Sequence, residues 1–372
     1  MTLKHLLFSA LMLLSAGTAW ADVEINETNY PDASFRNYLL SQDYGSDGKL
    51  TDEEIAGVTS INVSGTYFSP GTISSLKGIE FFTALEDLRC SDNQLNSLDV
   101  SGCTALTTLF CYNNQLTSLD VSKNTALTWL QCDNNQLTSL DVSKNTALTR
   151  LECYDNLLTS LDVSKNTALE TLSCGSNQLT SLDVSKNTAL IYLDCFGNQL
   201  TSLDLSKNTA LTRLHCYSNQ LTSLDISGCT ALTELRCYDN QLTSLDVSKN
   251  TVLTRLYCYQ NRIKGAAMDA LVASLPTVSN YTMRVVYYEN EQNVMTTTQV
   301  TAAKAKGWIP RYYDGNTWVE YAGVDPSTEV NNVEAADADD SAPWYTINGV
   351  QLAEKPTAPG IYIHGGKKVV VK

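Results

Sequence analysis

Histidine is scarce in this sequence of 372 residues, and the motifs that usually mark catalytic centres are missing. Only three histidines occur, and two of them, His215 and His364, lie beyond the first few residues. The sequence has no nucleophile elbow, no zinc-binding motif and no phosphate-binding loop. These absences argue against hydrolase, metalloenzyme and nucleotide-dependent chemistry, so we expect no catalytic residues.

Long apolar runs are also missing after the first 21 residues, which argues against a membrane span. The one early run, Leu6 to Leu14, is too short to cross a bilayer; it follows Lys4 and precedes Ala19-Trp20-Ala21. This order predicts a secretory signal peptide over residues 1–21. No Cys follows it to accept a lipid, so we expect a secreted or outer-surface protein.

Positive charge is the third deficit. The chain has 25 Lys and Arg residues against 40 Asp and Glu residues, for a net charge of -15. Such a chain would repel both nucleic acid and anionic lipid before contact. We therefore expect neither of these partners.

Cysteine, by contrast, is abundant and regularly spaced. Nine of the 11 cysteines recur every 21 residues within the phrase LxxLxCxxNxL. They are Cys90, Cys111, Cys132, Cys153, Cys174, Cys195, Cys216, Cys237 and Cys258. Self-similarity at a short fixed period is the signature of a repeat architecture, in which each unit covers the core of the next.

The phrase resembles the leucine-rich repeat over residues 58–265, with an irregular first turn, and the 21-residue length resembles internalin repeats. The resemblance implies an α/β solenoid, a horseshoe with a parallel β-sheet on its concave face. Within one unit, Leu130 and Cys132 alternate with polar residues, as in a short strand with one buried face. Nine strands about 4.8 Å apart would extend over roughly 43 Å.

Three ladders of repeated residues have structural interpretations. The thiols lie on one line and cannot converge on a metal, so we expect buried free cysteines. Cys103 and Cys229 occupy a turn position six repeats apart, too far for a disulfide. The Asn ladder from Asn93 to Asn261 should satisfy backbone groups at each turn. The Asp ladder from Asp99 to Asp246 should cap the next turn through N–H bonds from its Ser-Lys pair, with a calcium-loaded row as the alternative.

The repeats differ mainly at the outward positions of their strands. The segment from Leu116 to Thr128 recurs letter for letter from Leu137 to Thr149, whereas 10 of the 27 outward strand positions are aromatic and five are Arg. Tyr, Trp and Arg dominate the energetics of protein interfaces. The alternative is that aromatics merely shield the sheet. The predicted binding residues are Arg89, Phe110, Tyr112, Trp129, Arg150, Glu152, Tyr154, Tyr192, Phe196, Arg213, His215, Tyr217, Arg236, Tyr238, Arg255, Tyr257 and Tyr259.

Residues 22–57 form a predicted N-terminal cap, with a short helix over residues 34–40. The twelve residues from Asp43 to Glu54 resemble an EF-hand loop, with Asp47 fifth, Gly48 sixth and Leu50 eighth. The resemblance implies a calcium site. Its candidate ligands are Asp43, Asp47, Lys49, Thr51 and Glu54. Gly45 replaces the usual third ligand, and a turn-stabilised cap without calcium is the alternative.

Residues 266–324 form a predicted α/β cap, with helices over 266–275 and 297–306, a strand over 281–288 and a hairpin over 308–321. Residues 325–343 are acidic and poor in large apolar groups, which predicts a linker. Residues 344–372 contain two turn signals, Asn348-Gly349 and Gly365-Gly366. They resemble the β-rich tails of secreted Bacteroidetes proteins, including type A sorting domains, which implies sorting across an outer membrane.

Three functions compete at this point. The first is an adhesin-like module that binds a protein of the host or of a neighbouring cell. The second is glycan binding, in which Trp129, Tyr154, Tyr192 and Tyr217 stack on sugar rings. The third is catalysis by Glu152 with Asp133 or Asp194, which a flat ladder without a pocket disfavours. We predict the first.

Overall fold

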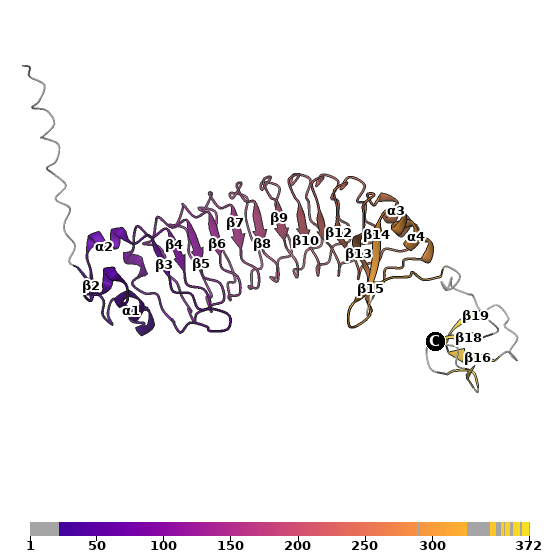
Figure 1. Ribbon diagram of the computed structural model, residues 1–372, viewed down its shortest axis with the longest axis horizontal. Helices are drawn as coiled ribbons and strands as arrows, with labels where there is room; N and C mark the ends of the chain where they lie inside the picture. Colours follow the sequence, from indigo (N-terminus) through magenta and orange to yellow (C-terminus); the bar gives the residue numbers. More distant parts are fainter. Residues whose placement is uncertain are drawn as a thin grey trace, which may run out of the picture.

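The computed structural model describes residues 22–288, 291–325, 343–346, 351–352, 354–357, 360–364 and 367–371. The predicted signal peptide and both turn signals of the tail lie outside these residues, as does the predicted linker apart from its end residues. The described repeats form one elongated arc with a cap at each end (Figure 1).

The N-terminal cap combines short elements around a small apolar core. They are β1 (Val23–Glu24), α1 (Ala33–Leu40), η1 (Asp43–Gly45), β2 (Lys49–Leu50) and α2 (Asp52–Gly57). The strands β1 and β2 pair antiparallel. Asp32 caps α1 by accepting bonds from the backbone N–H groups of Ser34 and Phe35. The helix predicted over residues 34–40 is therefore confirmed and begins one residue earlier.

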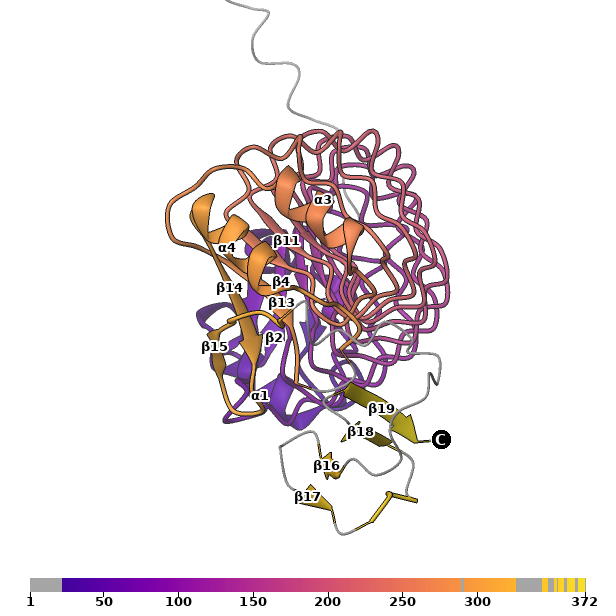
Figure 2. The ribbon, with the colours of Figure 1, turned by 90° about the vertical axis from the view of Figure 1, so that its right-hand side faces the viewer.

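The repeats build a single long sheet in which each strand pairs parallel and in register with the next. After β3 (Ser60–Asn62) and η2 (Ile79–Phe81), each repeat contributes one strand of three residues. These strands are β4 (Asp87–Arg89), β5 (Thr108–Phe110), β6 (Trp129–Gln131), β7 (Arg150–Glu152), β8 (Thr171–Ser173), β9 (Tyr192–Asp194), β10 (Arg213–His215), β11 (Glu234–Arg236) and β12 (Arg255–Tyr257). Seen along the solenoid axis, successive turns superimpose into one coil (Figure 2). The predicted solenoid is confirmed.

The inward residues of the repeats form the core. Leu130 and Cys132 are fully buried, as are the equivalent residues of the other eight repeats that carry this Cys, and all 11 cysteines are free thiols. Burial raises the pKa of Cys90 to about 12, so this thiol stays protonated at neutral pH. The cysteine ladder therefore acts as a row of small apolar side chains, as predicted.

Two asparagine ladders hold the turns. In the predicted one, the Asn135 amide donates to the carbonyl oxygens of Cys111, Cys132 and Asp133, and its oxygen accepts from Leu116 N–H. This role as a backbone partner is confirmed.

The second ladder is fully buried and consists of Asn124, Asn145, Asn166, Asn187, Asn208 and Asn250. Each amide donates to two carbonyl oxygens of the preceding repeat; that of Asn145 reaches Val121 and Asn124 at 2.9 and 2.8 Å. Cys103 and Cys229 take the same position in two repeats, which explains why they are buried and unpaired.

The aspartate ladder caps turns on the outer side of the coil. The Asp141 carboxylate accepts from the backbone N–H of Ser143 at 2.8 Å. This bond and the charge of Lys144 hold the pKa of Asp141 below its ordinary value. The predicted Ser half of the cap is confirmed, and the bond from the Lys N–H stays a prediction. None of the described His, Cys, Asp and Glu residues gather in threes to hold a metal ion, and the calcium-loaded row stays an alternative without support from this arrangement.

The C-terminal cap continues the sheet of the repeats. It consists of α3 (Ala266–Ser274), β13 (Tyr281–Val286), α4 (Thr297–Ala305), β14 (Trp308–Tyr313) and β15 (Trp318–Glu320). Strand β13 pairs parallel with β12, β14 with β13, and β15 turns back antiparallel. The sheet therefore has 13 strands rather than the nine counted from the cysteines. The helices α3 and α4 cross the end of the coil (Figure 2).

The described tail residues form a separate four-stranded antiparallel sheet, in the order β17-β16-β18-β19. Its strands are β16 (Trp344–Thr346), β17 (Gln351–Leu352), β18 (Gly360–His364) and β19 (Lys367–Val371). The β-rich character expected for residues 344–372 is thus present. None of the helices in the described ranges has the length and apolar character that crossing a bilayer requires.

Candidate binding face

The side of the sheet opposite the core carries three columns of side chains, which we call the sheet face. Its first and second columns are the first and third residues of each strand, because the middle Leu points inward. The third column is the residue after each inward Cys. All 17 predicted binding residues lie in these columns.

The arginines of the first column are the most exposed of these residues. Arg150, Arg213 and Arg255 are exposed, as is Arg89 in the second column, whereas the aromatic residues are mostly half-buried. Tyr259 was predicted to be a binding residue on the exposed face, and the structure corrects this. Only 8% of its surface is exposed, and Trp318 of the end hairpin packs against it at 4.9 Å between ring centroids. The arginines are therefore what a partner meets first.

A cluster of rings and arginines occupies the front of the sheet face, on β4 to β7. Phe110 and Trp129 meet edge to face, with their centroids 4.6 Å apart. The guanidinium groups of Arg89 and Arg150 lie over the Phe110 and Trp129 rings at 5.0 and 4.7 Å. Each arginine is thus held in place by an aromatic neighbour on the adjacent strand.

Beside this cluster lie two carboxylates that form no ion pair within the described residues, Asp133 and Glu152. Asp133 is 1% exposed, although its column was predicted to face solvent. Burial raises the pKa of Asp133, although hydrogen bonds from Asn134 and Tyr154 act to lower it. Burial and then the charge of Asp133 raise the pKa of Glu152. Ionisation of these two carboxyl groups is therefore less favourable in the folded protein than in water.

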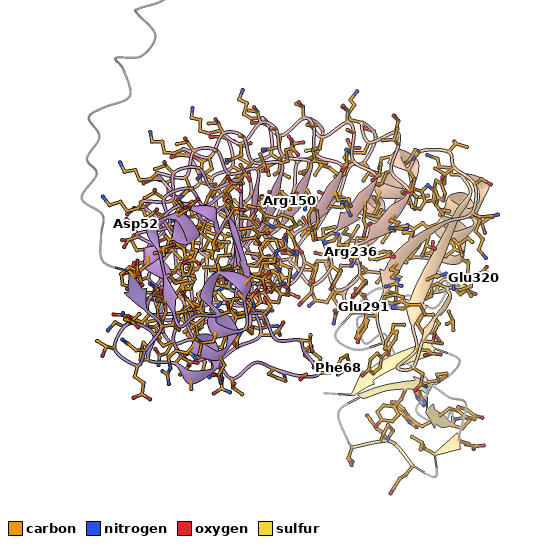
Figure 3. All side chains as sticks on the ribbon, turned by 60° about the vertical axis from the view of Figure 1, so that its left-hand side comes forward. Asp52, Phe68, Arg150, Arg236, Glu291 and Glu320 are labelled. Atoms are coloured by element: carbon orange, nitrogen blue, oxygen red, sulfur yellow. The ribbon has the colours of Figure 1, made fainter. Side chains whose placement is uncertain are left out.

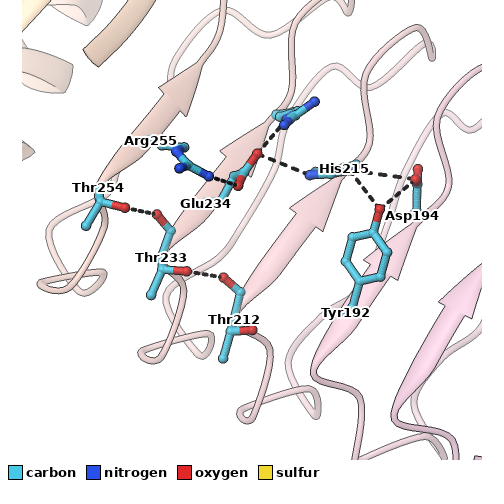
Figure 4. A network of polar contacts seen from close by, with 9 residues as sticks. Tyr192, Asp194, Thr212, His215, Thr233, Glu234, Thr254 and Arg255 are labelled. Carbon is cyan, nitrogen blue, oxygen red and sulfur yellow. Dashed lines mark hydrogen bonds and ion pairs between the residues drawn. The ribbon is translucent and has the colours of Figure 1, made fainter. Parts of the chain in front are cut away.

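The rear of the sheet face, on β9 to β14, carries a connected polar network (Figure 4). The Tyr192 hydroxyl donates to Asp194 at 2.8 Å and lies 3.0 Å from Nδ1 of His215. His215 Nε2 lies 3.4 Å from Glu234 on the next strand. Three strands are thus linked through their side chains, of which sequence analysis had predicted only Tyr192 and His215 as binding residues.

Glu234 ends this network in a buried position that sequence analysis did not single out. Its carboxylate accepts a short bond of 2.6 Å from Arg236 and lies 3.0 Å from Arg255. Burial opposes ionisation, but the bonds from both arginines, followed by the charges of Arg236 and His215, hold the pKa of Glu234 below its ordinary value. Glu234 is therefore an anchor for the arginines around it.

The third column of the rear half is a continuous stack of six aromatic rings. Its members are Phe196, Tyr217, Tyr238, Tyr259, Tyr287 and Tyr313, with successive centroids 4.3 to 5.4 Å apart and nearly parallel planes. The stack ends on Gly175, where an added Cβ would lie 2.3 Å from the Phe196 ring. The last two rings belong to the C-terminal cap. Sequence analysis missed them, because their spacing differs from the 21-residue period.

The second column adds two residues that the period also concealed, Arg284 and Arg311. They lie in register with Tyr257 on β13 and β14. Arg284 packs over the rings of Tyr257 and Trp318 at 4.3 and 4.5 Å. On the opposite side, the Arg236 guanidinium lies 5.4 Å from the Tyr257 centroid. Tyr257 is therefore enclosed between two arginines.

The ring packing bears on the glycan hypothesis. Tyr217 lies between Phe196 and Tyr238, so both faces of its ring are covered. Arginines cover one face of Trp129 and of Tyr192. Tyr217 cannot stack on a sugar, which corrects that part of the hypothesis.

A second unpredicted feature lies beside β3 and β4. Tyr67 and Phe68 are 80% and 94% exposed at the tip of a tight loop closed by a bridge between Thr66 and Ser69. Figure 3 shows Phe68 at the end of this loop, away from Arg150 and Arg236 on the strands. The only sign in the sequence was the extra length of the first repeat around Pro70.

The residues of the EF-hand-like loop are used to close the cap. The Glu54 carboxylate accepts from the N–H and the hydroxyl of Thr51, and Thr51 Oγ1 accepts from the Glu54 N–H, which together make a capping box for α2. Lys49 forms an ion pair with Asp22, and Asp47 accepts from the Lys49 backbone N–H. None of the described His, Cys, Asp and Glu residues gather in threes here, so a calcium site at Asp43, Asp47, Lys49, Thr51 and Glu54 stays a prediction.

Comparisons with known proteins agree with this architecture. The family model for leucine-rich repeats in two copies matches residues 83–124 and 209–250. No sequence among curated proteins matches the chain. The functional domain of InlJ from Listeria monocytogenes, which includes a cysteine ladder, is 34% identical, with a TM-score of 0.67 over 79% of this chain. The chain spans 62% of the length of that structure.

Two further structures share the fold at lower identity. A leucine-rich-repeat protein of Leptospira interrogans is 20% identical, with a TM-score of 0.50 over 69% of this chain and 78% of its own. The leucine-rich-repeat ectodomain of a plant membrane receptor kinase from Arabidopsis thaliana, in complex with CASPARIAN STRIP INTEGRITY FACTOR 2, is 20% identical, with a TM-score of 0.52 over 66% of this chain and 34% of its own. With its 13-stranded sheet and 21-residue units, the chain is a leucine-rich-repeat solenoid, and its repeats resemble those of InlJ.

Proposed function

We propose that this protein is a secreted or cell-surface recognition module that binds another protein through its sheet face. The observation that carries the proposal is the distribution of differences between repeats. The turns recur almost unchanged, as in the identical segments 116–128 and 137–149, whereas the first and second outward columns differ in nearly every repeat. The third column varies less and is Tyr in five of the nine repeats. Structural demands explain the constant positions, and a specific partner would explain the variable ones.

The chemistry of the face supports a protein as the partner. Exposed arginines held over aromatic rings offer large, stiff contact areas, which is the character of interface hot spots. The exposed pair Tyr67 and Phe68 adds an apolar contact beside the first strands. Leucine-rich-repeat proteins are in general interaction modules, and the family model that matches this chain describes leucine-rich repeats, with no indication of an enzyme. Secretion rests on the signal peptide predicted for residues 1–21.

The test compares variants of the two sides of the solenoid. A protein partner captured from the organism's surroundings should bind the double variant Trp129→Ala/Tyr154→Ala more weakly by about 2 kcal/mol, with the free energy of unfolding largely retained. Lys144→Ala, in a turn far from the sheet face, is the control and should bind like the parent chain. A larger loss from Lys144→Ala, or binding only to a glycan array, would contradict the proposal.

A further inference from the structure

The rear half of the sheet face carries more positive than negative side chains, although the chain as a whole is acidic. Each of the five consecutive strands β10 to β14 carries one arginine on this face, although the net charge of the chain is -15. We call this set the arginine patch. Its members are Arg213, Arg236, Arg255, Arg284 and Arg311. In the three columns of these strands, the only carboxylate is Glu234.

Three neighbouring acids among the described residues are already engaged by other groups. Glu234 binds Arg236 and Arg255, and Glu320 on β15 pairs with Lys304. Glu291 accepts backbone N–H bonds from Gln260, Tyr287 and Asn293. The patch therefore keeps an excess of positive charge.

Aromatic rings hold guanidinium groups of the patch in place, but some of their hydrogen-bond donors lack a partner among the described residues. Arg213 lies 4.9 Å from the Tyr192 ring, and Arg284 lies between the rings of Tyr257 and Trp318. Within the described ranges, Arg213, Arg284 and Arg311 form no ion pair, and Nε of Arg284 is buried without a hydrogen-bond partner. Fixed donors of this kind bind carboxylates with little loss of side-chain entropy.

We propose that the arginine patch binds an acidic segment of the partner protein, with the carboxylates of the segment received by the free guanidinium donors. This proposal rests on the proposed function and names the chemistry of the partner. The first and last of five strands at about 4.8 Å spacing lie four intervals, or about 19 Å, apart, which matches about six residues of an extended chain. The neighbouring rings are stacked on each other, which leaves their faces unavailable to sugars or bases.

The experiment uses the full chain and a fluorescent peptide of about six glutamates, a length set by the strand spacing. A matched peptide with glutamine at every position is the control ligand. Anisotropy titrations should show binding of the glutamate peptide at least about tenfold tighter than that of the glutamine peptide, with the difference falling as salt is added. Equal binding of the two peptides would overturn the proposal.

Variants then locate the site. Arg213→Gln/Arg255→Gln removes two exposed arginines, and Arg236→Gln/Arg284→Gln removes the pair that encloses Tyr257. Each should weaken binding of the glutamate peptide by about tenfold or more. Arg89→Gln/Arg150→Gln removes the same charge from the front half and should leave it nearly unchanged. The exposed pair keeps the test valid if the enclosed pair destabilises the fold.

The remaining outcomes separate this proposal from the proposed function. Full affinity in both patch variants, or an equal loss in the front-half control, would overturn the arginine patch as the site. If a captured partner still depends on Trp129 and Tyr154, the proposed function would survive that result. A sulfated oligosaccharide or a single-stranded oligonucleotide that binds the patch more tightly than the glutamate peptide would also overturn the choice of partner.

Discussion

The front and rear halves of the sheet face are built on the same repeat but treat charge in opposite ways. Glu152 in the front half has a raised pKa because it is buried near Asp133, whereas bonds from two arginines hold the pKa of Glu234 in the rear half down. Both glutamates are strand residues with the same buried leucine beside them. The three outward side chains of each repeat therefore decide the electrostatics of the face, because the backbone has the same conformation in both halves.

The aromatic residues divide in the same way. In the rear half, the third column forms a stack that joins the repeats to the C-terminal cap. In the front half, Tyr154 has no ring contact among the described residues and hydrogen-bonds to Asp133 instead. The rear half is thus stabilised by its own face, and the front half is less so.

The largest expected difference concerns these tyrosines. Tyr238→Ala removes a ring stacked on both sides and should lower the free energy of unfolding by about 2 to 3 kcal/mol. Tyr154→Ala, which breaks no ring pair, should cost about 1 kcal/mol. Chemical denaturation of the two variants measures the difference. Equal losses would show that the stack adds no more than ordinary burial.

A smaller difference is expected between the two glutamates. Glu234→Gln deprives the half-buried Arg236 and the exposed Arg255 of their charged partner and should cost about 1 kcal/mol, after allowance for solvent screening. Glu152→Gln relieves repulsion with Asp133, so it should be neutral or stabilising within about 0.5 kcal/mol. Thermal unfolding at neutral pH measures both. A larger loss of stability from Glu152→Gln than from Glu234→Gln would contradict this difference between the two halves.

The smallest effect is a dependence on pH. Because the folded-state pKa values of Asp133 and Glu152 are raised, their ionisation costs stability at neutral pH, and this cost disappears as the pH falls toward the ordinary carboxyl value of about 4. Glu234 has a lowered pKa, so its contribution persists over that range and is lost only at lower pH.

Any advantage of Glu152→Gln over the parent chain should therefore shrink between pH 7 and about pH 4.5, since the parent glutamate becomes protonated. The disadvantage of Glu234→Gln should stay nearly constant over the same range. Denaturation curves at the two pH values test this. A Glu152→Gln advantage that grows in acid would contradict the assigned direction.

Much of the fold could be predicted because the repeat imposes it at every turn. The inward Leu and Cys, the Asn ladder and the cap helices followed from spacing and local signals. The EF-hand-like loop shows the limit of a local pattern. The pattern offered Glu54 two partners, a metal ion or its own helix terminus, and only the fold showed the bonds of the capping box.

The site was less predictable because its columns continue onto strands of the C-terminal cap, which lie outside the 21-residue repeats. Arg284 and Arg311 come from strands of a different spacing, and they became neighbours of Tyr257 only when β13 and β14 joined the sheet. The burial of Tyr259 depends on Trp318, which lies about 60 residues farther along the chain. Such contacts carry no signature in either segment alone.

The sequence by itself determined the solenoid, its register and the identity of the outward side chains, because a 21-residue period leaves one way to bury every leucine. Only the tertiary structure decided which outward residues stay available to a partner. It did so by stacking six rings, placing arginines over aromatic neighbours and burying acids such as Glu234 and Asp133. The reason is physical: exposure and charge depend on neighbours across strands, which spacing along the chain does not specify.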